Sequence, residues 1–172
     1  MEFLTKAFSF DLQQTVIDFL RIAIAFLLAV PIGWERLQSE RSLGLRTFPI
    51  VAIGACGYVL ITKQISGSSP ESEARIIAGL LSGIGFIGGG AILKEGGNVK
   101  GLATASSIWV TGAIGAAVAL GREEIALVLS LITFCTLRLL SPVVHSNQST
   151  NNSDSQETDQ KINLSKLPVI DI

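Results

Sequence analysis

The sequence predicts an all-α membrane protein, a compact bundle of about five transmembrane helices. Three features of the 172-residue chain support this prediction. Its mean hydropathy is +0.53. Only 16% of its residues are charged, well below the roughly 25% typical of soluble domains. These charges gather in short intervals between long apolar runs. A chain of this composition is expected to lie in a lipid bilayer.

Five apolar runs are long enough to cross a bilayer, since a helical span requires about 20 mainly apolar residues. Each run must be helical in lipid, because unpaired backbone N–H and C=O groups cost several kcal/mol apiece there. The links between the runs are short and carry charges or turn residues, which favours antiparallel neighbours. The predicted spans are residues 12–33, 47–65, 72–93, 102–120 and 123–140.

The orientation follows from the lysines and arginines at the ends of these spans, because such residues are in excess on the cytoplasmic side. One side holds Arg36, Arg41, Arg46, Lys94, Lys100 and Arg138, and the other holds Lys6, Lys63, Arg75 and Arg122. This bias predicts a multi-pass protein of the cell inner membrane with its N-terminus outside and its C-terminus in the cytoplasm. Residues 1–141 then form the transmembrane domain.

The segment after the last apolar run has a different composition. Residues 142–172 include the polar stretch SNQSTNNSDSQETDQ, which cannot bury enough apolar surface to offset the entropy of ordering. We expect a disordered cytoplasmic tail there.

Several classes of function find no support in the residues. The net charge is −1 and no lysine and arginine cluster suits phosphate backbones, so nucleic acid is not an expected partner. Cys56 and Cys135 lie alone in apolar runs and His145 has no neighbouring ligand, so neither a metal site nor a cofactor is expected. Neither a Ser/His/Asp set nor paired carboxylates are visible, and we therefore do not expect an enzyme.

The third apolar run contains the sequence Gly83-Ile84-Gly85-Phe86-Ile87-Gly88, which has the letters of a dinucleotide-binding GxGxxG fingerprint. That fingerprint must follow a strand and open a helix, whereas this one lies inside an apolar run. Small residues spaced by four instead let helix backbones approach closely in lipid, although helix sliding or a thin pore would use the same glycines. The predicted packing residues are Gly79, Gly83, Gly85, Gly88 and Gly89.

Two ionisable residues lie inside the first span, where charges are costly and mark candidate functional residues. Asp18 and Arg21 are three residues apart and share a helix face, so a self-neutralising pair near the outer boundary is the favoured interpretation.

Charged and polar residues also gather at the predicted cytoplasmic ends of the helices. Arginine side chains bind carboxylates and phosphates with two parallel hydrogen bonds, so this rim could hold an anionic lipid headgroup or metabolite. Ordinary anchoring of the helices by positive charge explains the same residues equally well. The candidate binding residues are Glu35, Arg36, Arg46, Thr47, Lys94 and Glu95.

Ordered blocks of residues give the chain a resemblance to the MgtC/SapB family of bacterial membrane proteins. The blocks are Arg21, Gly33-x-Glu35-Arg36, Gly44-Leu45-Arg46-Thr47, Arg75-Ile76, Ser82 to Gly88, Lys94-Glu95-Gly96 and Val99-Lys100-Gly101-Leu102, leading to Ile108-Trp109. The resemblance covers residues 21–138 and gives Arg21 a functional interpretation as well. Ala103 and Ser106 depart from the family's usual Gly-Leu-Thr-Thr-Ala-Ala block.

The resemblance implies a five-helix membrane domain and a role in adaptation to low magnesium or stress. In pathogen members it also implies a contribution to survival inside macrophages. The chain is expected to be a short form without the soluble C-terminal domain of longer members. Implied partners are a membrane ATPase or another transport system.

Two functions from different classes follow. The first is a regulator or adaptor that acts through helix contacts, with homo-oligomers as a further interaction. The second is transport of magnesium or another small solute. Magnesium requires oxygen ligands, and Asp18 is the only acid well inside a span, which makes the second hypothesis the weaker one.

Overall fold

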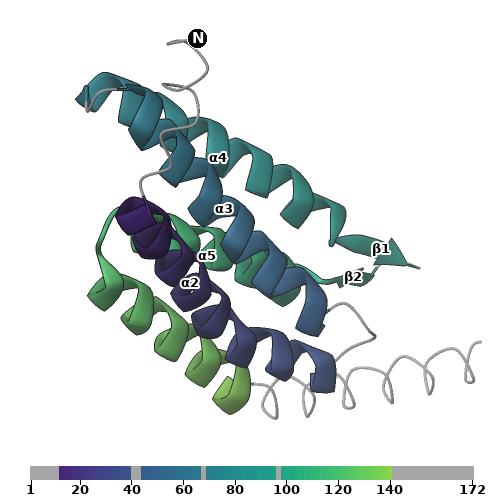
Figure 1. The fold of residues 1–172 in the computed structure, drawn as a ribbon. Helices are drawn as coiled ribbons and strands as arrows, with labels where there is room; N and C mark the ends of the chain where they lie inside the picture. The colour runs from purple at the N-terminus through teal and green to yellow at the C-terminus, as the bar shows by residue number, and fades with distance from the viewer. Residues whose placement is uncertain (1–11, 40–43, 67–68, 96–97, 141–172) are drawn as a thin grey trace, which may run out of the picture. The chain divides into compact units, whose positions relative to one another are not determined.

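The computed structural model describes residues 12–39, 44–66, 69–95 and 98–140. Its elements are α2 (Leu12–Ser39), α3 (Gly44–Ser66), α4 (Pro70–Gly90), the strands β1 (Leu93–Glu95) and β2 (Asn98–Lys100), α5 (Leu102–Ala119) and a last helix over residues 123–140 (Figure 1). The chain divides into two compact units after Leu137. The first unit holds all of these elements except residues 138–140, which continue the last helix and belong to the second.

The predicted all-α fold is confirmed for the described residues, apart from one small hairpin. Three of the helices are long and apolar enough to cross a membrane: Leu12–Gln38, Gly44–Gln64 and Leu102–Ala119. The α4 helix is not among them, because its first turn carries Glu71 and Glu73 and its second half is rich in glycine. Five spans and the orientation of the termini stay predictions, and the predicted tail at 142–172 lies outside the described residues.

The predicted end of the third span is wrong. The α4 helix ends at Gly90, and Leu93 begins β1, which pairs with β2 in an antiparallel hairpin with Leu93 opposite Lys100. A run of three glycines has low helix propensity, so the helix stops there although the chain is still apolar. Gly101, with a φ of 85°, then turns the chain into α5 in a conformation that favours glycine.

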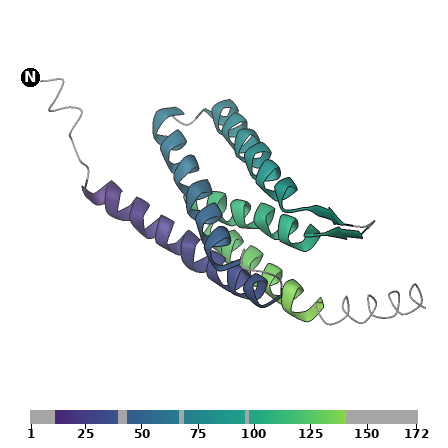
Figure 2. The ribbon, with the colours of Figure 1, turned by 90° about the vertical axis from the view of Figure 1, so that its right-hand side faces the viewer.

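The interior of the first unit lies between α2, α3 and α5. The α3 helix packs extensively on both α2 and α5, while α4 packs mainly on α5 and less on α3 (Figures 1 and 2). The largest side chains buried there are Ile32, Phe48, Cys56, Thr111, Ile114 and Val118.

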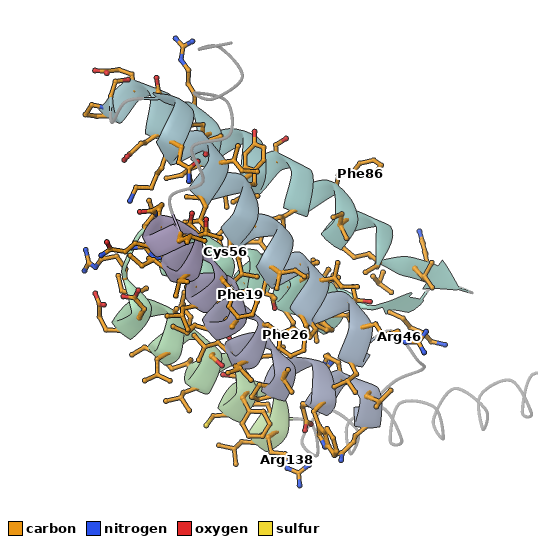
Figure 3. All side chains as sticks on the ribbon, in the orientation of Figure 1. Phe19, Phe26, Arg46, Cys56, Phe86 and Arg138 are labelled. Carbon is orange, nitrogen blue, oxygen red and sulfur yellow. The ribbon has the colours of Figure 1, made fainter. Side chains whose placement is uncertain are left out.

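The outer surface of the helices is apolar, as expected of a protein whose solvent is lipid. Phe86 of α4 is 85% exposed and points away from the other helices (Figure 3). Phe19 and Leu27 of α2 and Ile61 of α3 are also more than half exposed. Monomeric soluble proteins rarely expose so much contiguous apolar surface. The distribution therefore supports a membrane protein.

Close contacts between helices do involve glycines, but mostly not the predicted ones. Gly112 of α5 faces the side chain of Ile84 on α4, and Gly115 of α5 lies against the backbone carbonyl of Ala52 on α3. A side chain at either position would collide with the neighbouring helix. These two contacts let α5 pack at the centre of the bundle.

The predicted packing role of the α4 glycines is wrong for four of the five, as far as contacts within this chain are concerned. Gly79, Gly83, Gly85 and Gly89 are exposed, and a methyl group added to any of them would meet no atom closer than 4.0 Å. Only Gly88 lies against another helix, where an added methyl group would be 3.3 Å from the carbonyl oxygen of Ala105. Spacing alone does not reveal which side of a helix faces its neighbours.

The last helix is joined to α2 by a hydrogen bond in which Ser130 Oγ donates to the carbonyl oxygen of Leu28 at 2.7 Å. Hydrogen bonds between helices in membranes contribute roughly 0.5–1 kcal/mol. We expect Ser130→Ala to lower the free energy of unfolding in detergent by about that amount. Ser106→Ala is the control, because Ser106 is exposed and bonds only within α5. If both substitutions lowered the free energy of unfolding equally, the hydrogen bond between Ser130 and Leu28 would not account for the loss.

Candidate functional site

Four of the six predicted rim residues lie at a close crossing of α2 and α3. At this crossing Gly33 and Gly44 bring the two backbones into contact, and a methyl group on Gly44 would lie 3.0 Å from the carbonyl carbon of Arg36. The last turn of α2 is therefore held against the first turn of α3. Sequence reasoning did not predict this contact, although both glycines stand in the blocks that carry the family resemblance.

The crossing buries two charged side chains. Glu35 is 5% exposed and Arg36 is 9% exposed. The Nε atom of Arg36 is fully buried and has no hydrogen-bond partner in the described part of the chain. Such a group is unusual, because buried polar atoms are nearly always paired.

The other predicted rim residues lie in more open positions. Arg46, in the first turn of α3, is exposed, and Thr47 beside it is half-buried (Figure 3). Lys94 is exposed on β1, while the side chain of Glu95 lies outside the described side chains. The structure thus brings Glu35, Arg36, Arg46 and Thr47 to one crossing, and it shows no contact of Lys94 with them among the described residues.

The predicted pairing of Asp18 with Arg21 is wrong. The carboxylate of Asp18 accepts hydrogen bonds from Gln14 Nε2 at 2.9 Å and from Gln64 Nε2 of α3 at 3.2 Å. Within the residues that the structure describes, Asp18 and Arg21 form no ion pair. The Asp18 carboxylate therefore has two neutral hydrogen-bond donors, one of them from α3, in place of the Arg21 guanidinium.

Arg21 extends toward the end of α5. A methyl group on Gly121, just after that helix, would lie 3.9 Å from Arg21 Nη2. The C-terminal end of a helix carries a partial negative charge, so a guanidinium is stabilised there. Arg21 Nη2 thus lies near the end of α5, which the position of Arg21 in the sequence did not indicate.

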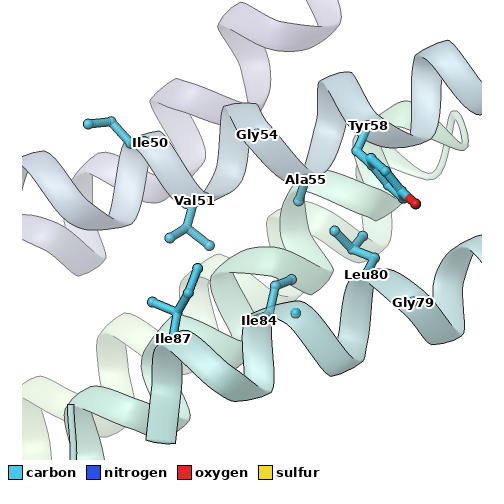
Figure 4. A pocket seen from close by; sticks show the side chains of 10 residues that line it. Ile50, Val51, Gly54, Ala55, Tyr58, Gly79, Leu80, Ile84 and Ile87 are labelled. Carbon is cyan, nitrogen blue, oxygen red and sulfur yellow. The ribbon is translucent and has the colours of Figure 1, made fainter. Parts of the chain in front are cut away.

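An apolar groove of about 440 Å³ separates α3 from α4 (Figure 4). Val51 and Ala55 of α3 point across it toward Ile84 and Ile87 of α4. Its lining residues are Ile50, Val51, Gly54, Ala55, Tyr58, Gly79, Leu80, Gly83, Ile84 and Ile87. The groove was not predicted, yet two of the α4 glycines singled out from the sequence line it. Their smooth surface faces the groove and not another helix of the chain.

Metal-binding chemistry has no visible framework in the described residues. No group of three or more His, Cys, Asp or Glu side chains among them could hold a metal ion. Asp18 is a single carboxylate that accepts hydrogen bonds from the side-chain amides of Gln14 and Gln64. Arg21 lies near Gly121, at the end of α5.

Comparison with known proteins gives one consistent result. The model of the MgtC family matches residues 22–146. The chain is 42% identical over 123 residues to "Protein MgtC" of Brucella abortus (strain 2308), covering 72% of this chain and 51% of that protein. It is 42% identical over 121 residues to "Protein MgtC" of Salmonella typhimurium (strain LT2), covering 70% and 51%. The chain thus spans about half the length of these curated relatives. No solved structure matches it.

Proposed function

This chain belongs to the MgtC family, and from that premise we propose that it is a regulatory or adaptor protein of the cell inner membrane. It acts in adaptation to low magnesium or ionic stress by binding a transmembrane helix of a larger membrane complex. A membrane ATPase or transporter is the proposed class of partner. All five helices cross the membrane, with the N-terminus outside and the C-terminus in the cytoplasm.

The groove between α3 and α4 is the observation that carries this proposal. It is apolar, it opens on the surface of the bundle, and Gly54, Gly79 and Gly83 leave parts of its walls without side chains. Helices associate in lipid through close backbone approach over small residues, because lipid tails already satisfy apolar side chains. A groove with this lining suits the backbone of a partner helix.

The side chains that line the groove are suited to binding and not to catalysis. Its lining residues are aliphatic side chains and glycines, with the hydroxyl of Tyr58 as the polar group. A groove of this kind offers shape and apolar contact, and it lacks the groups that activate a nucleophile or transfer a proton. We therefore propose a role in assembly and regulation and not an enzymatic one.

Transport of magnesium is the second candidate, and Asp18 is the residue that could serve it. A magnesium ion keeps several waters and takes carboxylate oxygens as ligands. The two oxygens of Asp18 already accept hydrogen bonds from Gln14 and Gln64. This arrangement favours a carboxylate that joins α2 to α3 over one that coordinates a passing ion.

One experiment compares the two functions on the same protein. The chain is expressed in a strain that lacks its own MgtC-family protein, and growth is measured at limiting magnesium. Purified protein in liposomes is assayed in parallel for magnesium flux with an indicator dye. We expect restored growth and no flux above that of empty liposomes. A flux that Asp18→Ala abolishes would contradict the regulatory proposal and support transport.

A further inference from the structure

The guanidinium of Arg36 is a buried charge without a counterion among the described residues. An arginine side chain carries a positive charge in proteins. The side chain is only 9% exposed, and its Nε atom has no acceptor in the described ranges. An unpaired buried charge is strongly unfavourable. A bound anion at this position would offset that cost.

The described neighbouring groups do not supply that anion. Glu35 precedes Arg36 in α2, but adjacent residues of a helix point to different sides, and Glu35 has an interaction of its own. The first turn of α3, which packs against the Arg36 backbone, contains no acidic residue. The end of α2 offers a partial negative charge to Arg36, but the buried Nε atom makes no hydrogen bond to it.

Two further positive features converge on the same crossing. The start of α3 at Gly44 is the positive end of a helix dipole, which favours anions. Arg46 lies in that same first turn and is exposed, so its side chain can move toward a ligand that arrives from solvent or from the headgroup layer. A buried arginine, a helix start and a second arginine form a suitable environment for a tetrahedral oxyanion.

We propose that the crossing of α2 and α3 binds a phosphate group, held by the buried Arg36 together with the first turn of α3 and Arg46. Phosphate accepts two parallel hydrogen bonds from a guanidinium and further bonds from backbone N–H groups. The phosphate belongs to an anionic lipid headgroup or to a soluble phosphate compound. This site lies apart from the groove between α3 and α4 and does not depend on helix docking.

The test measures thermal unfolding of the purified 172-residue chain in a phosphate-free maltoside detergent. Three additions are compared at matched ionic strength: inorganic phosphate, phosphatidylglycerol and phosphatidylcholine. A ligand present at a hundredfold excess over its dissociation constant raises the unfolding temperature by about 5 to 10 °C in a protein of this size. We expect such a rise with inorganic phosphate or with phosphatidylglycerol. A rise with phosphatidylglycerol alone identifies a lipid, and a rise with inorganic phosphate identifies a soluble ligand.

Arg36→Met is the variant that isolates the site. It should lose the rise in unfolding temperature while unfolding, without ligand, at or above the wild-type temperature, because an apolar side chain replaces an unpaired buried charge. Arg75→Met is the matched control, since Arg75 is exposed on α4 away from the crossing. It should keep the full rise.

Three outcomes would overturn the proposal: no rise in wild-type protein with any addition, an undiminished rise in Arg36→Met, or equal loss in Arg75→Met. If Arg36→Met does not fold, Arg36→Lys replaces it. Lysine keeps the charge but cannot donate two parallel hydrogen bonds as arginine does. We therefore expect Arg36→Lys to bind phosphate at least tenfold more weakly, which corresponds to about 1.4 kcal/mol of binding free energy. An unchanged response in Arg36→Lys would also overturn the proposal.

Discussion

Gly115→Val is expected to lower the free energy of unfolding by about 3 kcal/mol and to reduce the amount of folded protein in the membrane. Gly115 lies where α5 crosses α3, and a side chain there would collide with the carbonyl oxygen of Ala52 and lie 3.0 Å from the Cβ atom of Ala55. Backbone atoms in a packed bundle cannot move aside without displacing a helix. Unfolding in detergent and the yield of folded protein measure the effect.

Gly54→Val is the matched control for this prediction. Gly54 lies on α3, but a methyl group there would meet no atom within 4 Å. The substitution should change the free energy of unfolding by no more than about 0.5 kcal/mol. If Gly54→Val proved as damaging as Gly115→Val, the loss would come from changing any glycine in this bundle and not from the contact between α5 and α3.

Gly83→Phe is expected to abolish the restored growth at limiting magnesium while the protein still folds and inserts. Gly83 lines the groove between α3 and α4 and has open space where its side chain would begin. A phenyl ring there reaches into the groove of about 440 Å³ and blocks the approach of a helix backbone. Growth and the unfolding temperature are measured on the same variant.

The control for Gly83→Phe is Ala78→Phe, on the same helix. Ala78 is exposed and is not part of the groove lining. This variant adds the same aromatic surface outside the groove and should restore growth fully. Normal growth with Gly83→Phe would remove the groove as the docking site, and failure of both variants would point to a general effect of added bulk on α4.

The helices could be predicted from the sequence because their apolar length is a local property of the chain. The positions where the helices end were harder to predict. The first predicted span stops at Gly33, whereas α2 continues to Ser39, since polar residues at a membrane surface extend a helix as readily as apolar ones. The hairpin of β1 and β2 falls at a link that was expected only to be short and to carry charges or turn residues, because strands of three residues leave almost no pattern.

The residues that an individual side chain contacts lie in distant parts of the chain, and the spacing of residues within one helix cannot predict them. Asp18 and Arg21 share a helix face, yet Gln64 of α3 donates a hydrogen bond to the Asp18 carboxylate and Arg21 Nη2 lies near Gly121, just after α5. Similarly, the glycines of α4 fit a packing motif, but Gly79 and Gly83 line a groove, while Gly112 and Gly115 of α5 make close contacts with other helices. At the crossing of α2 and α3, the sequence left anion binding and ordinary anchoring of the helices as equal interpretations, and the burial of Arg36 became visible only with the two helices in place.

The hydrogen bond from Ser130 to Leu28 has a consequence for biosynthesis. It joins residues 102 positions apart, so the last helix can dock on α2 only after nearly the whole bundle has been made. At a synthesis rate of about 5–20 residues per second, roughly 5 to 20 s separate the two residues. During that interval the surface of α2 that will receive Ser130 faces lipid or the insertion machinery. The nascent chain therefore offers a transient binding face that the finished protein has covered.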